Sequence, residues 1–178
     1  MDALSEYLYF FTYAPIAIFL FSLIKCWKDI GARWFLTLLV SVECIDLYSI
    51  QYSLNWTTHY YIWSAFMGFL FLAPSFFRSK IAQTFYTKTN RQFFLEASKL
   101  RFTQQEAAIL FISFISMIAN LVSYIEILMY KYDFIAVPYF KIYALNNLQL
   151  ITHVLVCLAA LSFSIRSIKG HNNETART

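Results

Sequence analysis

Five long apolar runs, separated by shorter polar segments, follow one another along the chain. Each run has between 18 and 25 residues, the length that a helix needs to cross a hydrocarbon core of about 30 Å. The runs cover residues 7–24, 34–54, 60–77, 106–130 and 142–165. This pattern predicts an all-α integral membrane protein, a single-domain bundle of about five transmembrane helices.

The longest polar segment, residues 78–105, separates the third run from the fourth. At helical spacing, one face of its second half is formed by Phe93, Phe94, Ala97 and Leu100. This pattern predicts a short amphipathic helix whose apolar face lies in the lipid headgroup region. Thr103 is followed three residues later by Glu106, which predicts a capping box at the start of the fourth span.

Composition and charge agree with a membrane protein and orient it. Hydrophobic residues make up 60% of the chain and charged residues 13%, against about 25% charged in soluble domains. Twelve of the 14 Lys and Arg lie in the loops after the first and third runs or in the polar tail, residues 166–178. The positive-inside rule therefore places the N-terminus outside and the tail in the cytoplasm. We expect a multi-pass protein of a bacterial inner membrane.

The second run contains two carboxylates, Glu43 and Asp46, on one helical face. A charge at the bilayer centre costs about 2.5–3.5 kcal/mol on insertion scales, so this face needs partners. At 1.5 Å per residue, the two carboxylates lie roughly 13–18 Å from the inner face, Asn120 about 21 Å from it, and His153 about 16 Å from the outer face. We therefore expect Glu43 or Asp46 to pair with His153, and Asn120 to hydrogen-bond to the same cluster.

Further polar residues follow helical spacing in the fourth and fifth runs. They are Ser116, Ser123, Glu126, Asn146 and Gln149. Two interpretations are open, because such stripes line a polar path in some membrane proteins and simply pack helices together in others. By depth, Glu126 and Asn146 should meet near the outer surface.

No enzyme signature is present: the chain lacks GxSxG, HExxH, P-loop and GxGxxG motifs. The cysteines Cys26, Cys44 and Cys157 have no metal-ligand spacing, and His153 is the one histidine within an apolar run, which argues against haem held by two histidines. We therefore predict no catalytic residue, no metal and no cofactor. The net charge of +4 follows from topology, so we predict no nucleic-acid partner.

Two classes of function remain. The first is a non-enzymatic membrane protein that acts through helix–helix contacts in the bilayer, as a subunit, a sensor or accessory module, or an immunity-type protein of a larger membrane system. The alternative is a small oligomeric transporter or channel that uses Glu43, Asp46 and His153 for protons or cations. Only three glycines are present, and transporters usually break their helices with Gly or Pro, so the sequence favours the first class. Its partners would be the lipid bilayer and either another membrane protein or further copies of the chain.

Overall fold

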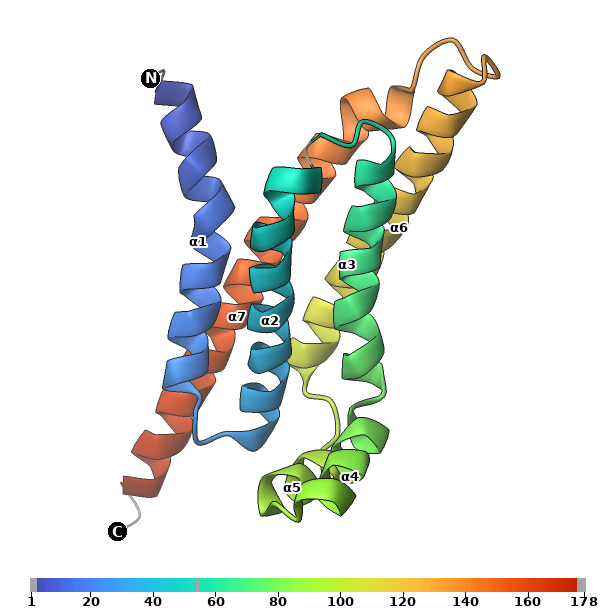
Figure 1. Cartoon of the computed structure of the whole chain (residues 1–178). Coiled ribbons are helices and arrows are strands. Elements are labelled where there is room, and N and C mark those ends of the chain that lie inside the picture. Colours follow the sequence, from blue (N-terminus) through green and yellow to red (C-terminus); the bar gives the residue numbers. More distant parts are fainter. Residues whose placement is uncertain (1–2, 54, 176–178) are drawn as a thin grey trace.

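The computed structural model describes the backbone of residues 3–53 and 55–175 and the side chains of residues 13–53 and 55–165. Within these residues the protein is all-helical, without strands. The long helices are α1 (Ala3–Lys25), α2 (Ile30–Ser53), α3 (His59–Phe76), α6 (Gln104–Lys131) and α7 (Asn146–Thr175). They run alternately in opposite directions (Figure 1). The prediction of an all-α fold is confirmed.

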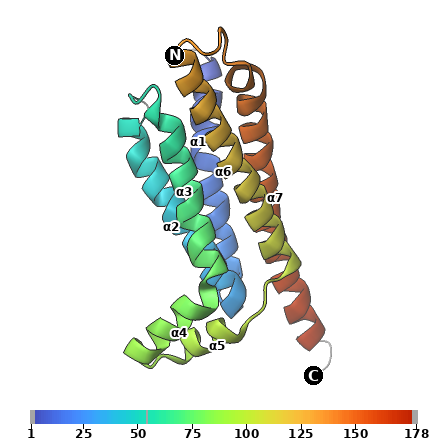
Figure 2. The same cartoon turned by 90° about the vertical axis from the view of Figure 1, so that its right-hand side faces the viewer.

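The remaining helices are short. Helices α4 (Arg78–Thr89) and α5 (Gln92–Lys99) lie across one end of the bundle (Figure 2), which we call the α4–α5 end. At the far end, a π-helix, η1 (Phe140–Leu145), leads directly into α7. Helix α7 continues to Thr175, beyond the expected end of the fifth span.

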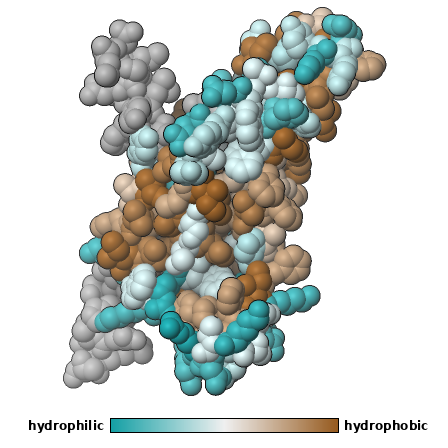
Figure 3. Space-filling view, viewed as in Figure 1, coloured by the Kyte–Doolittle hydropathy of each residue, from teal (hydrophilic) through white to brown (hydrophobic). Residues whose placement is uncertain are grey.

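Within the described residues, two helical stretches are long and apolar enough to cross a membrane, Gln104–Lys131 and Phe140–Ile165. Helices α3 and α4 meet the same criteria together, as a broken span bent by 69°. This set of two or three is smaller than the predicted five. The described side chains of α1 form only a shorter apolar helix, Tyr13–Lys25, and α2 carries two carboxylates. The surface shows an apolar middle with polar groups towards both ends (Figure 3), as in a membrane protein.

The long helices form a ring. Along the ring, α1 packs against α2, α2 against α3, α3 against α6, α6 against α7, and α7 against α1. The hydrophobic core fills the half of this ring next to the α4–α5 end. At its centre the ring of Phe35, 1% exposed, lies 5.3 Å from that of Phe71 and 6.0 Å from that of Phe163. This half of the bundle is therefore closed by tightly packed aromatic and aliphatic side chains.

The capping box predicted at the start of α6 is confirmed. The Glu106 N–H donates to Thr103 Oγ1 at 3.2 Å, and the Thr103 N–H donates to Glu106 Oε2 at 2.7 Å. Helix α2 begins in a similar way, because Asp29 Oδ1 accepts hydrogen bonds from the N–H groups of Gly31 and Ala32. These side chains satisfy backbone donors that have no partner within the helix.

The amphipathic helix predicted in the polar segment is α5, and part of its apolar face packs against other helices of the protein. Phe93 and Phe94 pack against Trp34 of α2, with ring centroids 6.2 and 6.1 Å away. Ala97 is fully buried in the same cluster with Ala82 of α4. Protein therefore covers part of this face, because the segment also forms α4, which packs against α5. Phe93 and Phe94 are half-buried, and Leu100 remains exposed.

A buried ion pair at the α4–α5 end was not predicted. Arg78 Nη1 donates to Glu106 Oε1 at 2.7 Å, and the two side chains are 4% and 1% exposed. Arg78 Nη2 also donates to the Leu100 carbonyl at 2.9 Å, and the guanidinium lies 4.8 Å from the centre of the Phe102 ring. The pair ties the junction of α3 and α4 to the start of α6.

Candidate functional site

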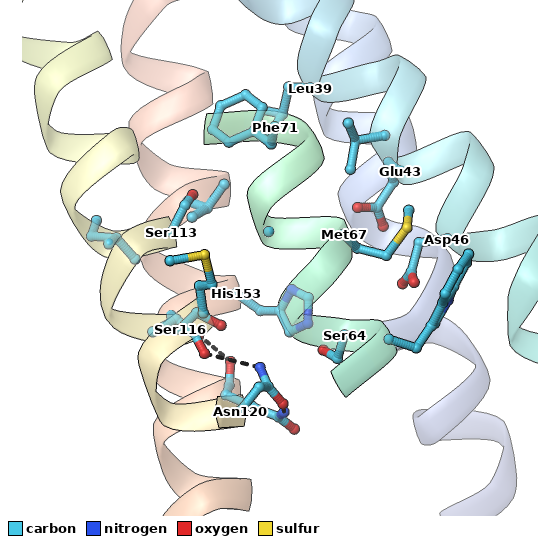
Figure 4. A pocket seen from close by; sticks show the side chains of 18 of the residues that line it. Leu39, Glu43, Asp46, Ser64, Met67, Phe71, Ser113, Ser116, Asn120 and His153 are labelled. Atoms are coloured by element: carbon cyan, nitrogen blue, oxygen red, sulfur yellow. Dashed lines mark hydrogen bonds between the residues drawn. The ribbon is translucent and has the colours of Figure 1, made fainter. Parts of the chain in front are cut away.

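A pocket of about 190 Å³ lies inside the helix ring and receives side chains from all five long helices. Phe19, Leu39 and Phe71 belong both to the hydrophobic core and to the pocket lining, so they form its floor. Figure 4 shows Leu39 and Phe71 at one end of the pocket and Asn120 at the other. The pocket therefore begins where the core ends and extends towards the far end of the bundle.

All four residues of the predicted intramembrane cluster line this pocket. Glu43 and Asp46 project from α2, Asn120 from α6, and His153 from α7 (Figure 4). Both carboxylates are half-buried, whereas His153 is exposed. The convergence expected from their depths in the bilayer is therefore present in the structure.

The expected direct pairing of His153 with a carboxylate is not formed. Among the described residues, the one ion pair is that of Arg78 and Glu106. Asp46 and His153 instead project into the same pocket from α2 and α7. The physical reason is that the pocket lies between the two side chains, so they face one another across it. The depth of each residue in the bilayer predicts that these groups lie at one level, but it does not predict the space between them.

Asn120 holds two helices together instead of bonding to the carboxylates. Its Nδ2 donates to the Ser116 carbonyl at 2.9 Å, and its Oδ1 accepts from Gln149 Nε2 of α7 at 2.9 Å. Asn120 is only 2% exposed. Ser116 and Gln149 also line the pocket, so this amide pair forms a polar wall opposite the carboxylates.

The other predicted polar positions lie away from the pocket. Ser123 is fully buried, and its hydroxyl has no hydrogen-bond partner among the described residues. The Glu126 carboxylate accepts hydrogen bonds from the N–H groups of Phe140 and Lys141, both at 2.8 Å, and so caps η1. Asn146 is exposed. The expected meeting of Glu126 with Asn146 is therefore wrong, because the backbone of η1 occupies the carboxylate.

One wall of the pocket was not predicted. It comes from α3 and includes Tyr60, Trp63, Ser64 and Met67. These residues follow helical spacing along the third apolar run, which was a signal for one common face. The aromatic residues among them also fit the aromatic belt that membrane proteins place at the lipid–water interface, so their spacing alone did not identify a pocket wall.

The pocket offers acid–base and cation-binding groups. Within the described residues, no cluster of three or more His, Cys, Asp or Glu side chains could hold a metal ion. Half-buried carboxylates near an imidazole can bind a cation or exchange protons.

Outside the pocket, the thiol of Cys26 follows the end of α1 and is fully buried. Burial raises the pKa of the Cys26 thiol, so it stays protonated and unreactive.

Comparisons with protein-family models, with curated proteins and with solved structures find no match for this chain. The function must therefore be argued from the pocket and the fold.

Proposed function

We propose that the chain is a multi-pass membrane protein of five spans, with the N-terminus outside and the α4–α5 end in the cytoplasm. Helices α1 and α2 lie alongside α7 and α3 in the ring, so a bilayer around α6 and α7 would surround them as well. The basic residues of the polar segment gather at the α4–α5 end, as the positive-inside rule requires. The carboxylates of α2 face the pocket inside the ring, a position in which membrane proteins tolerate ionisable side chains.

We further propose that this protein transports a small cation or protons through the pocket. One observation carries the proposal: Glu43 and Asp46 of α2 and His153 of α7 face the same pocket. Ionisable groups within a membrane bundle are expensive and commonly mark ion or proton pathways. The core closes the cytoplasmic half, so the arrangement suits a carrier with access from one side at a time better than a continuous pore.

Flux measurements test this proposal. In proteoliposomes, we expect the native chain to carry protons or monovalent cations, and Asp46→Asn to lower that flux at least tenfold, because the amide keeps the shape and removes the charge. Glu96→Gln is the matched control, since Glu96 is exposed on α5, away from the pocket. Native protein without flux, or an Asp46→Asn variant with native flux, would contradict transport through this pocket.

A second candidate function, action through helix–helix contacts, is favoured by the outer face of α2. Its exposed residues include a polar stripe at alternating steps of four and three residues: Thr37, Ser41, Cys44, Tyr48 and Gln51. Small and hydrogen-bonding side chains are those that membrane helices place between themselves, and this spacing is that of a helix–helix seam. The stripe lies outside the ring, so a further copy or another protein could bind there.

Disulfide formation through Cys44 tests whether two copies of the chain contact each other through α2. If α2 packs against α2 of another copy, mild oxidation in native membranes is expected to produce a disulfide-linked dimer, because Cys44 is exposed in the stripe. Cys44→Ser should abolish the dimer, whereas Cys157→Ser, on α7, should not change it. A native chain that remains monomeric on a non-reducing gel would argue against this contact between two copies.

A further inference from the structure

The carboxylates in the pocket lack partners from the protein. Among the described residues, no side chain donates a hydrogen bond to the carboxylate of Glu43 or Asp46, and none forms an ion pair with it. His153 lines the same pocket without forming an ion pair with either carboxylate. Both carboxylates therefore face the pocket without a partner from the protein, and a positive group from outside the chain can pair with them there.

Aromatic side chains are held beside Asp46. The indole of Trp63 donates from Nε1 to Ser49 Oγ at 3.0 Å, and Ser49 Oγ donates in turn to the Asp46 carbonyl at 3.0 Å. Tyr60, one turn before Trp63 on α3, lines the pocket together with Asp46. Carboxylates together with the faces of Tyr and Trp are the groups that bind organic ammonium ions.

The size of the pocket and the side chains that line it also favour an organic ammonium ion. A volume of about 190 Å³ is several times the roughly 30 Å³ occupied by one water molecule, and it is smaller than the about 300–1,000 Å³ of sites for drug-sized ligands. No set of three or more metal-ligating side chains exists among the described residues. Apolar groups such as Met67 and Val156 complete the lining, and they suit carbon atoms rather than a bare or hydrated ion.

Access to the pocket is from the outer side. The apolar floor of Phe19, Leu39 and Phe71 separates it from the α4–α5 end. His153 is exposed, Tyr60 and Gln149 are half-buried, and neither hydrophobic cluster of the described residues extends to this side of the pocket. With the topology proposed above, a water-soluble cation would enter on the side opposite the α4–α5 end, which is the outside of the cell.

We propose that the pocket binds a small organic ammonium ion from the outer side, with its charge between Asp46 and Glu43 and its carbon atoms against Tyr60 and Trp63. This inference rests on the proposed function, because it names the class of cation that the transporter carries. The amide pair of Asn120 and Gln149 and the ring of His153 form the opposite, polar wall. These side chains can donate a hydrogen bond to a short polar tail on the ligand or accept one from it.

Calorimetry with charged and neutral probes of equal shape tests the ligand class. The protein is purified in a maltoside detergent, which contains no ammonium group. The probes are choline against 3,3-dimethylbutan-1-ol, and n-butylammonium against butan-1-ol. We expect at least one ammonium probe to bind with one site per chain, and its neutral counterpart to bind at least tenfold more weakly. Equal binding of charged and neutral probes, or no binding of either ammonium, would overturn the proposal.

Variants locate the site. Asp46→Asn is expected to weaken ammonium binding at least tenfold, and Tyr60→Leu severalfold, whereas Tyr60→Phe keeps the aromatic face and should bind as the native chain does. Glu96→Gln, exposed on α5 and away from the pocket, is the control and should bind normally. If Asp46→Asn fails to fold, the Tyr60 pair still decides: equal binding by the Leu and Phe variants overturns the proposal.

The two proposals fail separately. Asp46-dependent flux of protons or alkali cations in a chain that binds neither ammonium probe would overturn the ligand class and leave transport standing. Ammonium binding that depends on Asp46, in a chain that carries no cation across proteoliposomes, would support the ligand class and overturn transport. The pocket would then belong to a receptor.

Discussion

Arg78→Ala is expected to destabilise the protein by about 3–5 kcal/mol, the range measured when one partner of a buried ion pair is removed. The substitution leaves the Glu106 carboxylate, 1% exposed, without its closest positive charge. It also removes the hydrogen bond to the Leu100 carbonyl and the contact with the Phe102 ring. The loss should be measured as a shift in the SDS-induced or thermal unfolding of the purified protein, followed by helical circular dichroism.

Two further variants separate the ion pair from general damage. Arg101→Ala removes an exposed arginine of the same segment and should change stability by less than about 0.5 kcal/mol. The double variant Arg78→Met with Glu106→Gln removes both charges while Gln preserves the capping box, so it should recover much of the loss. An Arg78→Ala protein as stable as Arg101→Ala would show that the pair does not hold α4 to α6.

Gly68→Val is expected to cost about 1–3 kcal/mol, the usual range for overpacking a well-packed interior. A Cβ atom at Gly68 would stand 3.2 Å from Cβ and 3.8 Å from Cα of Met117. These atoms are fixed to the backbone of α6, so the new side chain must push α3 and α6 apart. Because Gly68 and Met117 both line the pocket, ammonium binding should weaken as well.

The matched pair for this prediction is alanine at both helical glycines. Gly68→Ala should destabilise the protein measurably. Gly31→Ala should be close to neutral, because its Cβ would meet Leu100 Cδ1, the flexible end of a side chain, at 3.4 Å. The unfolding midpoints of the two alanine variants, measured under the same conditions, test this expectation. If Gly68→Ala is no less stable than Gly31→Ala, the close approach of α3 to α6 does not limit the packing.

The features that sequence predicted are those set by local signals or by depth. The capping box of Thr103 and Glu106 needs only neighbouring residues, and it is present. The rise of a helix is constant, so counting residues brought Asp46, Asn120 and His153 to one level. The structure places them around one pocket.

The features that sequence missed depend on which helices are neighbours. Arg78 and Glu106 are separated by 28 residues, and they meet only because α4 and α5 fold back under the bundle. Depth could not show that a pocket separates Asp46 from His153, so a direct pair was expected where a space exists. The covered face of α5 has the same cause, since the position of Trp34 beside Phe93 is a tertiary contact. Periodicity gives the angle of each side chain on its own helix and nothing about the neighbour.

The π-helix η1 sets the rotation of α7. A π-turn accommodates one residue more than an α-helical turn, so side chains before and after it are offset by about 100° compared with an uninterrupted helix. Glu126 clamps the first turn of η1 through two backbone hydrogen bonds. Removing one residue from η1 would therefore leave α7 in place along its axis yet turn Gln149 and His153 away from the pocket. In a lineage of such proteins, a single-codon insertion or deletion here would switch the chemistry of the pocket without any substitution within it.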